Sequence, residues 1–127
     1  GATLIVYANP SDIYGNDINY IEVWEGNVLR ANFTASGGTV RVNASAVLTF
    51  KVSIRLNSTL AVSTSEAISY TAVYMNITGI WTNKEFNNTS VQLVGSFYYL
   101  IEQGVLNANS LNEGQTYVCS VLYKAYY

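Results

Sequence analysis

Six asparagines stand in the Asn-x-Ser/Thr pattern that marks acceptors for N-linked glycans: Asn32, Asn43, Asn57, Asn76, Asn87 and Asn88. Asn9 is excluded because Pro10 follows it. With 14 Asn and 23 Ser or Thr in the chain, roughly 2.5 matches are expected by chance. Glycans are bulky and hydrophilic, so dense modification predicts a domain displayed outside the cell. The alternative is that a chain rich in Asn and Thr contains the pattern without being modified.

Residues suited to catalysis or metal binding are few. The chain has no histidine and a single cysteine, which excludes Ser-His and Cys-His nucleophile systems. Glu22 and Glu25 are close in sequence, but we interpret them as solvated rim residues rather than as a glycosidase pair. We therefore expect no enzyme, no metal and no cofactor, with covalent N-linked glycans as the only addition.

Three other residue types leave alternatives open. Cys119 shares the apolar parity of its expected strand, which favours a buried thiol over an intermolecular disulfide. The eleven tyrosines suit strands, although some could line a sugar-binding face. Lys51, Lys84 and Lys124 have the residue type for a covalent amide crosslink to Asn or Asp, without further support in the sequence.

Composition bounds the class of protein. The length of 127 residues fits one domain, with 50% hydrophobic and only 11% charged residues. A net charge of −2 with six Lys and Arg gives no basic surface for nucleic acid. The chain starts at Gly1, so we expect a mature secreted product whose signal peptide has been removed. No apolar run approaches the ~20 residues that a membrane span needs.

Alternating polar and apolar residues predict an all-β protein. The clearest strand covers 46–56, where Leu48, Phe50 and Val52 share one parity and Lys51 shares the other. Seven or more strands at such spacing predict an immunoglobulin-like or pilin-like β-sandwich of about seven strands. The other expected strands are 18–24, 28–34, 67–78, 91–101 and 117–127, separated by turns at 15–17, 25–27, 36–38, 83–88 and 112–114, with a short helical turn near 102–111.

The parity of these strands predicts which side of the sheet each sequon occupies. A glycan cannot sit in a core, so a modified Asn must share the polar parity of its strand. Asn57 and Asn43 continue the parity of Lys51, and Asn32 shares the parity of Arg30. Asn76 faces outward if Val73, Met75 and Ile77 face inward.

The amino-terminal stretch Thr3, Leu4, Ile5, Val6, Tyr7 and Ala8 is β-branched or aromatic at four of six positions. This composition predicts a strand buried on both faces. Asn9, Pro10 and Gly15 mark a tether, so we divide the chain into a strand and tether, 1–17, and a β-sandwich body, 18–127. The strand either folds into its own sheet or fills a gap in another subunit. Donation to a neighbour would propagate head to tail and give a filament.

An apolar terminal strand, a short tether, an all-β body, one cysteine and many sequons resemble the thread filament subunits of thermoacidophilic archaea. That family is similar in fold to bacterial type 1 pilins, and the resemblance covers the whole chain by pattern and composition. It implies a glycosylated extracellular filament on the cell surface, polymerised from identical subunits by donor-strand complementation. Thr3 to Ala8 would be the donor strand, and the filament would serve adhesion, cell aggregation or biofilm formation through contacts with cell surfaces or other filaments.

One departure and one alternative accompany this resemblance. Bacterial type 1 pilins typically carry an internal disulfide, which a chain with a single cysteine cannot form. The alternative function is a monomeric glycosylated binding module of the cell surface, either carbohydrate-binding or associated with a surface layer.

Overall fold

The computed structural model describes residues 1–10, 17–34, 36–56 and 72–124. Within these residues the protein is all-β, with ten strands in two five-stranded sheets and no helix. The strands are β1 (Ala2–Pro10), β2 (Asp17–Glu25), β3 (Val28–Phe33), β4 (Gly38–Val42), β5 (Leu48–Arg55), β6 (Ala72–Ile77), β7 (Trp81–Glu85), β8 (Asn87–Val94), β9 (Phe97–Leu106) and β10 (Thr116–Lys124).

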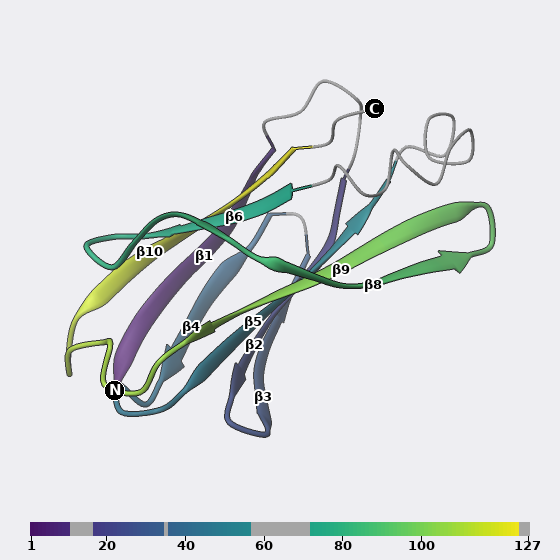
Figure 1. Ribbon diagram of the computed structural model, residues 1–127. Coiled ribbons are helices and arrows are strands. Elements are labelled where there is room, and N and C mark those ends of the chain that lie inside the picture. Colours follow the sequence, from purple (N-terminus) through teal and green to yellow (C-terminus); the bar gives the residue numbers. More distant parts are fainter. Residues whose placement is uncertain (11–16, 35, 57–71, 125–127) are drawn as a thin grey trace.

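The two sheets form a β-sandwich around one hydrophobic core, which confirms the predicted fold class. We call the sheet with strand order β4-β1-β10-β6-β7 sheet A, and the sheet with order β3-β2-β5-β9-β8 sheet B. The chain crosses between sheets at both sides of the sandwich, from β3 to β4 and from β7 to β8 (Figure 1).

Alternation predicts the faces of the central strands correctly. In β5, Leu48, Phe50 and Val52 are fully buried, while Lys51 is half-buried on the outer side. In β10, Tyr117, Cys119, Val121 and Tyr123 are buried against the same core, as their shared parity predicts. These strands lie inside their sheets, where one face is covered by the opposite sheet and the period of two is preserved.

Three local predictions are wrong. The expected strand 91–101 is a hairpin, in which β8 and β9 are joined by a turn at Gly95 and Ser96. The expected turn 83–88 contains the end of β7 and the start of β8, and the first half of the expected helical turn at 102–111 belongs to β9. Short strands at sheet edges carry weak alternation, and this explains why ten strands exist where about seven were predicted.

β1 is buried on one face, not on both as its composition predicts. Ala2, Leu4 and Val6 are fully buried, whereas Ile5 and Tyr7 are 39% and 38% exposed. The strand lies in the middle of sheet A, but the outer face of that sheet is uncovered in the described part of the chain. β-branched and aromatic residues on that face satisfy strand preference without being core residues.

Gly37 lies where the chain enters β4, beside Val6 and Tyr7 in the middle of β1. Its φ of +82° belongs to the left-handed region that favours glycine. A Cβ at this position would lie 2.0 Å from the carbonyl oxygen of Val6 and 2.7 Å from the Cα of Tyr7. Only a residue without a side chain therefore allows the chain to turn into β4 this close to the β1 backbone.

Replacing an inward and an outward residue of β1 separately tests whether this strand buries only one of its faces. We expect Leu4→Ala to lower the free energy of unfolding by about 2–5 kcal/mol, because it leaves a cavity in the core. Ile5→Ala should cost less than about 1 kcal/mol, because the side chain is on the outer face. Urea denaturation of both variants measures the difference. Equal losses would mean that β1 does not present alternate faces.

Candidate functional site

The site predicted from the sequence is β1 and the slot that holds it. β1 pairs in parallel with β10, so that Leu4 lies opposite Tyr117 and Val6 opposite Cys119. On its other side it pairs antiparallel with β4, with Leu4 opposite Val40. Thr3 and Ala8 belong to the same paired segment. In this chain the predicted donor strand therefore occupies its own sheet.

The tether residues lie at the end of this strand or beyond it. Asn9 and Pro10 are the last residues of β1, opposite Leu122 and Tyr123 of β10. Gly15 lies outside the described residues. The division into 1–17 and 18–127 stays a prediction, although β1 packs in the same core as the strands of the body.

The outer face of β1 borders a groove across sheet A. Tyr7 lies opposite Ser120, which in turn lies opposite Asn76 on β6. The groove has a volume of about 420 Å³, and Val118 and Leu122 also line it. Ser120 is only 8% exposed although it faces outward, because larger side chains stand in the same row on both sides. The groove is thus polar at its centre and apolar on its flanks.

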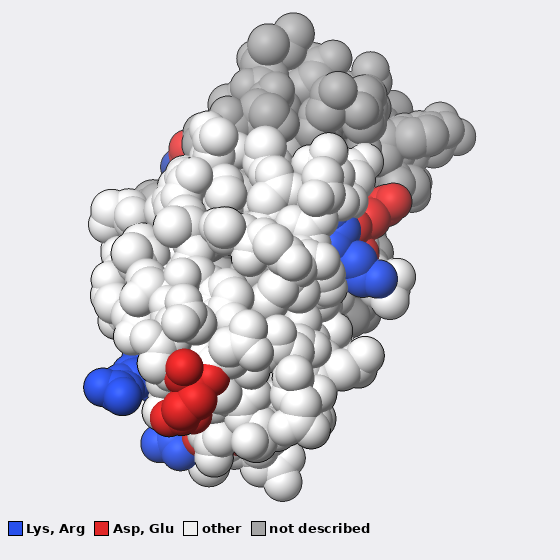
Figure 2. Space-filling model, turned by 90° about the vertical axis from the view of Figure 1, so that its left-hand side faces the viewer, with Lys and Arg blue, Asp and Glu red and all other residues white. Residues whose placement is uncertain are grey.

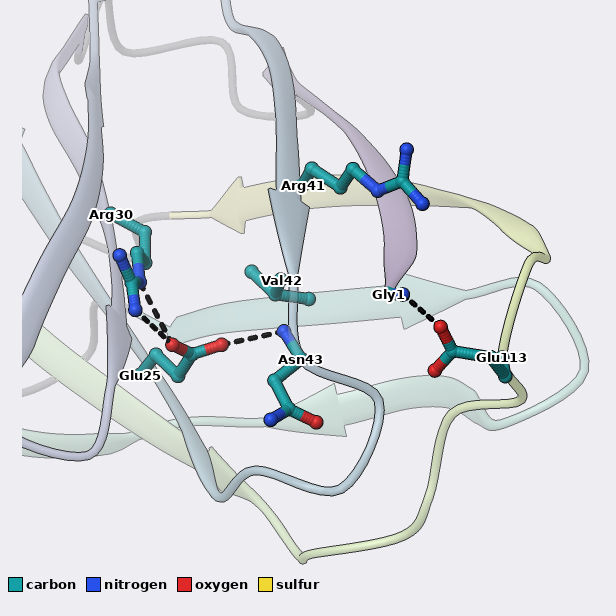
Figure 3. Close-up of a pocket in the computed structure, with 7 residues that line it drawn as sticks. All are labelled: Gly1, Glu25, Arg30, Arg41, Val42, Asn43 and Glu113. Carbon is teal, nitrogen blue, oxygen red and sulfur yellow. Dashed lines mark hydrogen bonds and ion pairs between the residues drawn. The ribbon is translucent and has the colours of Figure 1, made fainter.

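A polar cluster fixes the beginning of β1. The amino group of Gly1 forms an ion pair with Glu113, and this amine lowers the pKa of the Glu113 carboxyl. The Gly114 backbone N–H also donates to the Gly1 carbonyl at 2.8 Å, and the Thr3 N–H donates to the Gln115 carbonyl at 2.9 Å. The turn before β10 therefore holds the first residues of the chain in register (Figure 3).

The same hollow contains a second set of contacts that joins the two sheets. Glu25, at the end of β2, accepts hydrogen bonds from the Asn43 backbone N–H at 2.5 Å and from Arg30 at 2.5 and 2.8 Å. The Asn43 N–H first, and Arg30 second, lower the pKa of the Glu25 carboxyl. Figure 3 shows this carboxylate between the Arg30 side chain and the Asn43 backbone, with Arg41 lying apart from both. The hollow is about 560 Å³.

Asn32 and Asn43 are exposed, as their parity predicts, and Asn76 is half-buried at the edge of the groove. Asn87, for which parity made no prediction, is also exposed. Asn88 belongs to β8, opposite Glu102. Asn57 lies outside the described residues.

Two sequons use their side chains in local hydrogen bonds. The Asn43 side-chain oxygen accepts from the Ser45 backbone N–H at 2.9 Å, and the Asn76 oxygen accepts from the Asn83 N–H. Both contacts use the amide oxygen, whereas an N-linked glycan is attached to the nitrogen. The contacts are therefore compatible with modification.

Glu102 is a buried carboxylic acid that the sequence reasoning missed. It is 2% exposed, points into the core from β9 and accepts a hydrogen bond from the Val73 backbone N–H of β6. Its second oxygen has no hydrogen-bond partner among the described residues. Burial, aided by the charge of Glu85, raises its pKa to about 8. Parity contained the signal, because Glu102 is two residues from buried Leu100, but the expected helical turn obscured it.

Within the described ranges, no three His, Cys, Asp or Glu residues could share a metal ion. Cys119 is fully buried, and burial raises the pKa of its thiol to about 12, which disfavours the reactive thiolate at neutral pH. Figure 2 shows one side of the molecule with few charged side chains, which lie near its margins.

Comparison with known proteins does not place this chain in a family. No protein-family model, curated protein or solved structure matches the chain. Among the described residues there is no helix with the length and apolar character required to cross a bilayer.

The buried acid predicts a dependence of stability on pH. An unfolded Glu loses its proton near pH 4.5, whereas folded Glu102 keeps it until about pH 8. Glu102 therefore takes up a proton on folding between these values, so its contribution to stability is fully present below about pH 4.5 and is lost as pH rises through about 8. The upper limit of this loss is about 5 kcal/mol.

Urea denaturation of the wild type and Glu102→Gln across this range tests the assignment. The uncharged amide should flatten the fall in stability, and Glu85→Gln should reduce it in part, since Glu85 helps to raise the Glu102 pKa. Glu25 and Glu113 remain in all three proteins, so their contributions cancel in the differences. Parallel curves for wild type and Glu102→Gln would contradict a buried neutral carboxyl.

Proposed function

We propose that the protein is the structural subunit of an extracellular filament, in which each copy donates β1 to the next copy. The filament would serve adhesion, cell aggregation or biofilm formation, without an enzymatic step. The observation that carries the proposal is the position of β1. It is the first strand of the sequence, yet it lies in the interior of sheet A with neighbours on both edges.

We expect β1 to be exchangeable between copies. The next strand of the sequence, β2, lies in sheet B, so no hairpin turn joins β1 to its neighbours in sheet A. The contacts in an exchanged pair would be the same as those within one chain, with Leu4 facing Tyr117 and Val40. Exchange therefore needs no new interface, and heterologous transfer from copy to copy gives a linear polymer.

The free energy gained by burying β1 between β4 and β10 explains why this position must be occupied by a strand. Leu4 and Val6 together contribute on the order of 3–6 kcal/mol of apolar burial, as an upper estimate. Without β1, the facing edges of β4 and β10 would also lose their backbone partners. This loss is a large part of the 5–15 kcal/mol typical of a whole domain. A body deprived of its own β1 would strongly favour the β1 of a neighbour.

The positions of the sequons support display outside the cell. Asn32 and Asn87 lie on the two edge strands of sheet B, and Asn43 follows β4, one of the two edge strands of sheet A. Glycans at these sites would surround the rims of the sandwich. They would leave the slot between β4 and β10 free for a strand.

The second candidate is a self-contained binding module of the cell surface, displayed as a glycosylated monomer. The observation that favours it is that β1 pairs with β4 and β10 of its own chain. The groove bordered by Tyr7 and Asn76 would then be the surface available to a ligand such as a carbohydrate. The two candidates differ in whether β1 pairs within one chain or between chains.

A disulfide between β1 and β4 distinguishes the candidates. Ile5 lies opposite Thr39 on the outer face, where both side chains are exposed, so Ile5→Cys with Thr39→Cys leaves the core intact. The Cα separation of antiparallel neighbours, about 4.5–5.5 Å, suits a disulfide. Exchanged β1 strands would join neighbouring chains and give a covalent ladder in a non-reducing gel.

The control is Ile5→Cys alone, which should give no ladder because Cys119 is buried. Electron microscopy of native surface material should show filaments in the samples that give the ladder. A single crosslinked band at monomer size, from a preparation without filaments, would contradict the filament and leave the binding module.

Mass spectrometry tests whether the exposed sequons carry glycans. We expect mass spectrometry of peptides from the native protein to find added sugar on exposed Asn32, Asn43 and Asn87. Enzymatic release should convert each modified Asn to Asp. Unmodified asparagine at all three positions would remove the support that the sequons give to extracellular display.

A further inference from the structure

β8 is an edge strand without the usual protection against pairing with another chain. It forms one edge of sheet B and carries no charged residue in its eight positions. The other described edge strands each carry charge, with Arg30 on β3, Arg41 on β4, and Lys84 beside Glu85 on β7. Charged side chains on an edge strand oppose pairing with a further strand, so β8 is the edge most open to it.

Part of the inner face of β8 is also uncovered. Val91 and Leu93 lie opposite Leu100 and Tyr98 of β9, on the side of sheet B that faces the core. Leu100 is fully buried, but Val91 and Leu93 are 39% and 58% exposed. The β8–β9 hairpin extends beyond the part of sheet A formed by β7 (Figure 1). Within the part of the chain that the structure describes, an unpaired edge and an exposed apolar patch therefore coincide on β8.

We propose that β8 is a self-association edge, through which two copies of this chain pair antiparallel along residues 90–94 about a two-fold axis at Gln92. In this register Val91 of each copy lies opposite Leu93 of the other. The four apolar side chains then share one face, which joins the two exposed patches. A shift by one residue would place them on opposite faces.

The chemistry of β8 argues for a second copy as the occupant. The strand has no charge with which to select a charged peptide, and at its centre the two-fold register pairs Val91 with Leu93 and Gln92 with Gln92. The register also ends at Ser90, so exposed Asn87 and its sequon lie outside the paired segment. A glycan at Asn87 is therefore compatible with the contact, and it would prevent a longer pairing.

A cysteine at the two-fold axis tests the register. In Gln92→Cys the two thiols would lie on directly opposite residues, within disulfide range. We expect mild oxidation of the folded protein to give a covalent dimer. Gln103→Cys, on the exposed face of interior strand β9, is the matched control and should stay monomeric. Buried Cys119 should not compete.

A charged substitution at Leu93 tests how much the exposed apolar residues of β8 contribute to dimer formation. Leu93→Lys should weaken dimer formation in sedimentation equilibrium by about tenfold, because two apolar pairs are lost at each contact. Val28→Lys, at a 50% exposed position on the opposite edge strand β3, should leave it unchanged. Both positions are solvent-exposed, so neither variant should disturb folding.

The other outcomes overturn the proposal. If both lysine variants weaken association, the contact joins β8 to β3 and is not two-fold. If wild type stays monomeric at high concentration and Gln92→Cys gives no dimer, β8 does not self-associate. In the oxidation and the sedimentation experiments β1 stays in its own sheet. A negative result for β8 pairing is therefore distinct from a negative result for the exchange of β1.

Discussion

The rest of the structure depends on the insertion of β1 between β4 and β10. Among the described strands, β1 is the only neighbour of β4 in sheet A, so without β1 this sheet would be reduced to β10, β6 and β7. The contact with β10 is parallel, which requires a long connection, and here that connection is the whole remaining chain. The hydrophobic core is therefore completed by the first and last strands of the sequence together. Such non-local pairing closes late in folding, because the entropy of loop closure must be overcome first.

The sequence predicts the interior of this fold better than its edges. β5 and β10 could be assigned with the correct inward faces because each is covered on one side only, so that polarity alternates. The burial predicted for β1 was wrong on one face, because Ile5 and Tyr7 are strand-forming residues that face outward. The turn at Gly95 and Ser96 was missed because apolar residues flank it on both sides, and nothing in the local pattern marks a reversal. Edge strands and their turns are decided by pairing across the sheet, which a local pattern does not contain.

For the candidate site, too, the sequence predicts what depends on a single strand but not what depends on pairing between distant strands. Parity was sufficient to place Asn32 on the surface and to orient Asn76 away from Val73 and Met75, since it needs only the direction of one strand. It could not show that the groove beside Asn76 is bordered by Tyr7, because these residues are 69 positions apart and meet only through β10. Glu102 required knowledge of where β9 ends, and a hydrogen bond from β6 in the other sheet makes its burial tolerable.

The two contacts proposed for this protein have different symmetry and would act together. Exchange of β1 is heterologous, with a donor surface and an acceptor surface, so it extends without limit in one direction. Pairing of β8 is isologous and saturates at two copies. β8 and the β1 slot lie in different sheets, so one copy has room for both contacts. A filament held by the strong contact would thus carry a row of weak lateral edges, and each lateral pair would add to the next along the filament length. Repeated weak pairing of this kind would join the proposed filaments side by side, although each single pair is weak.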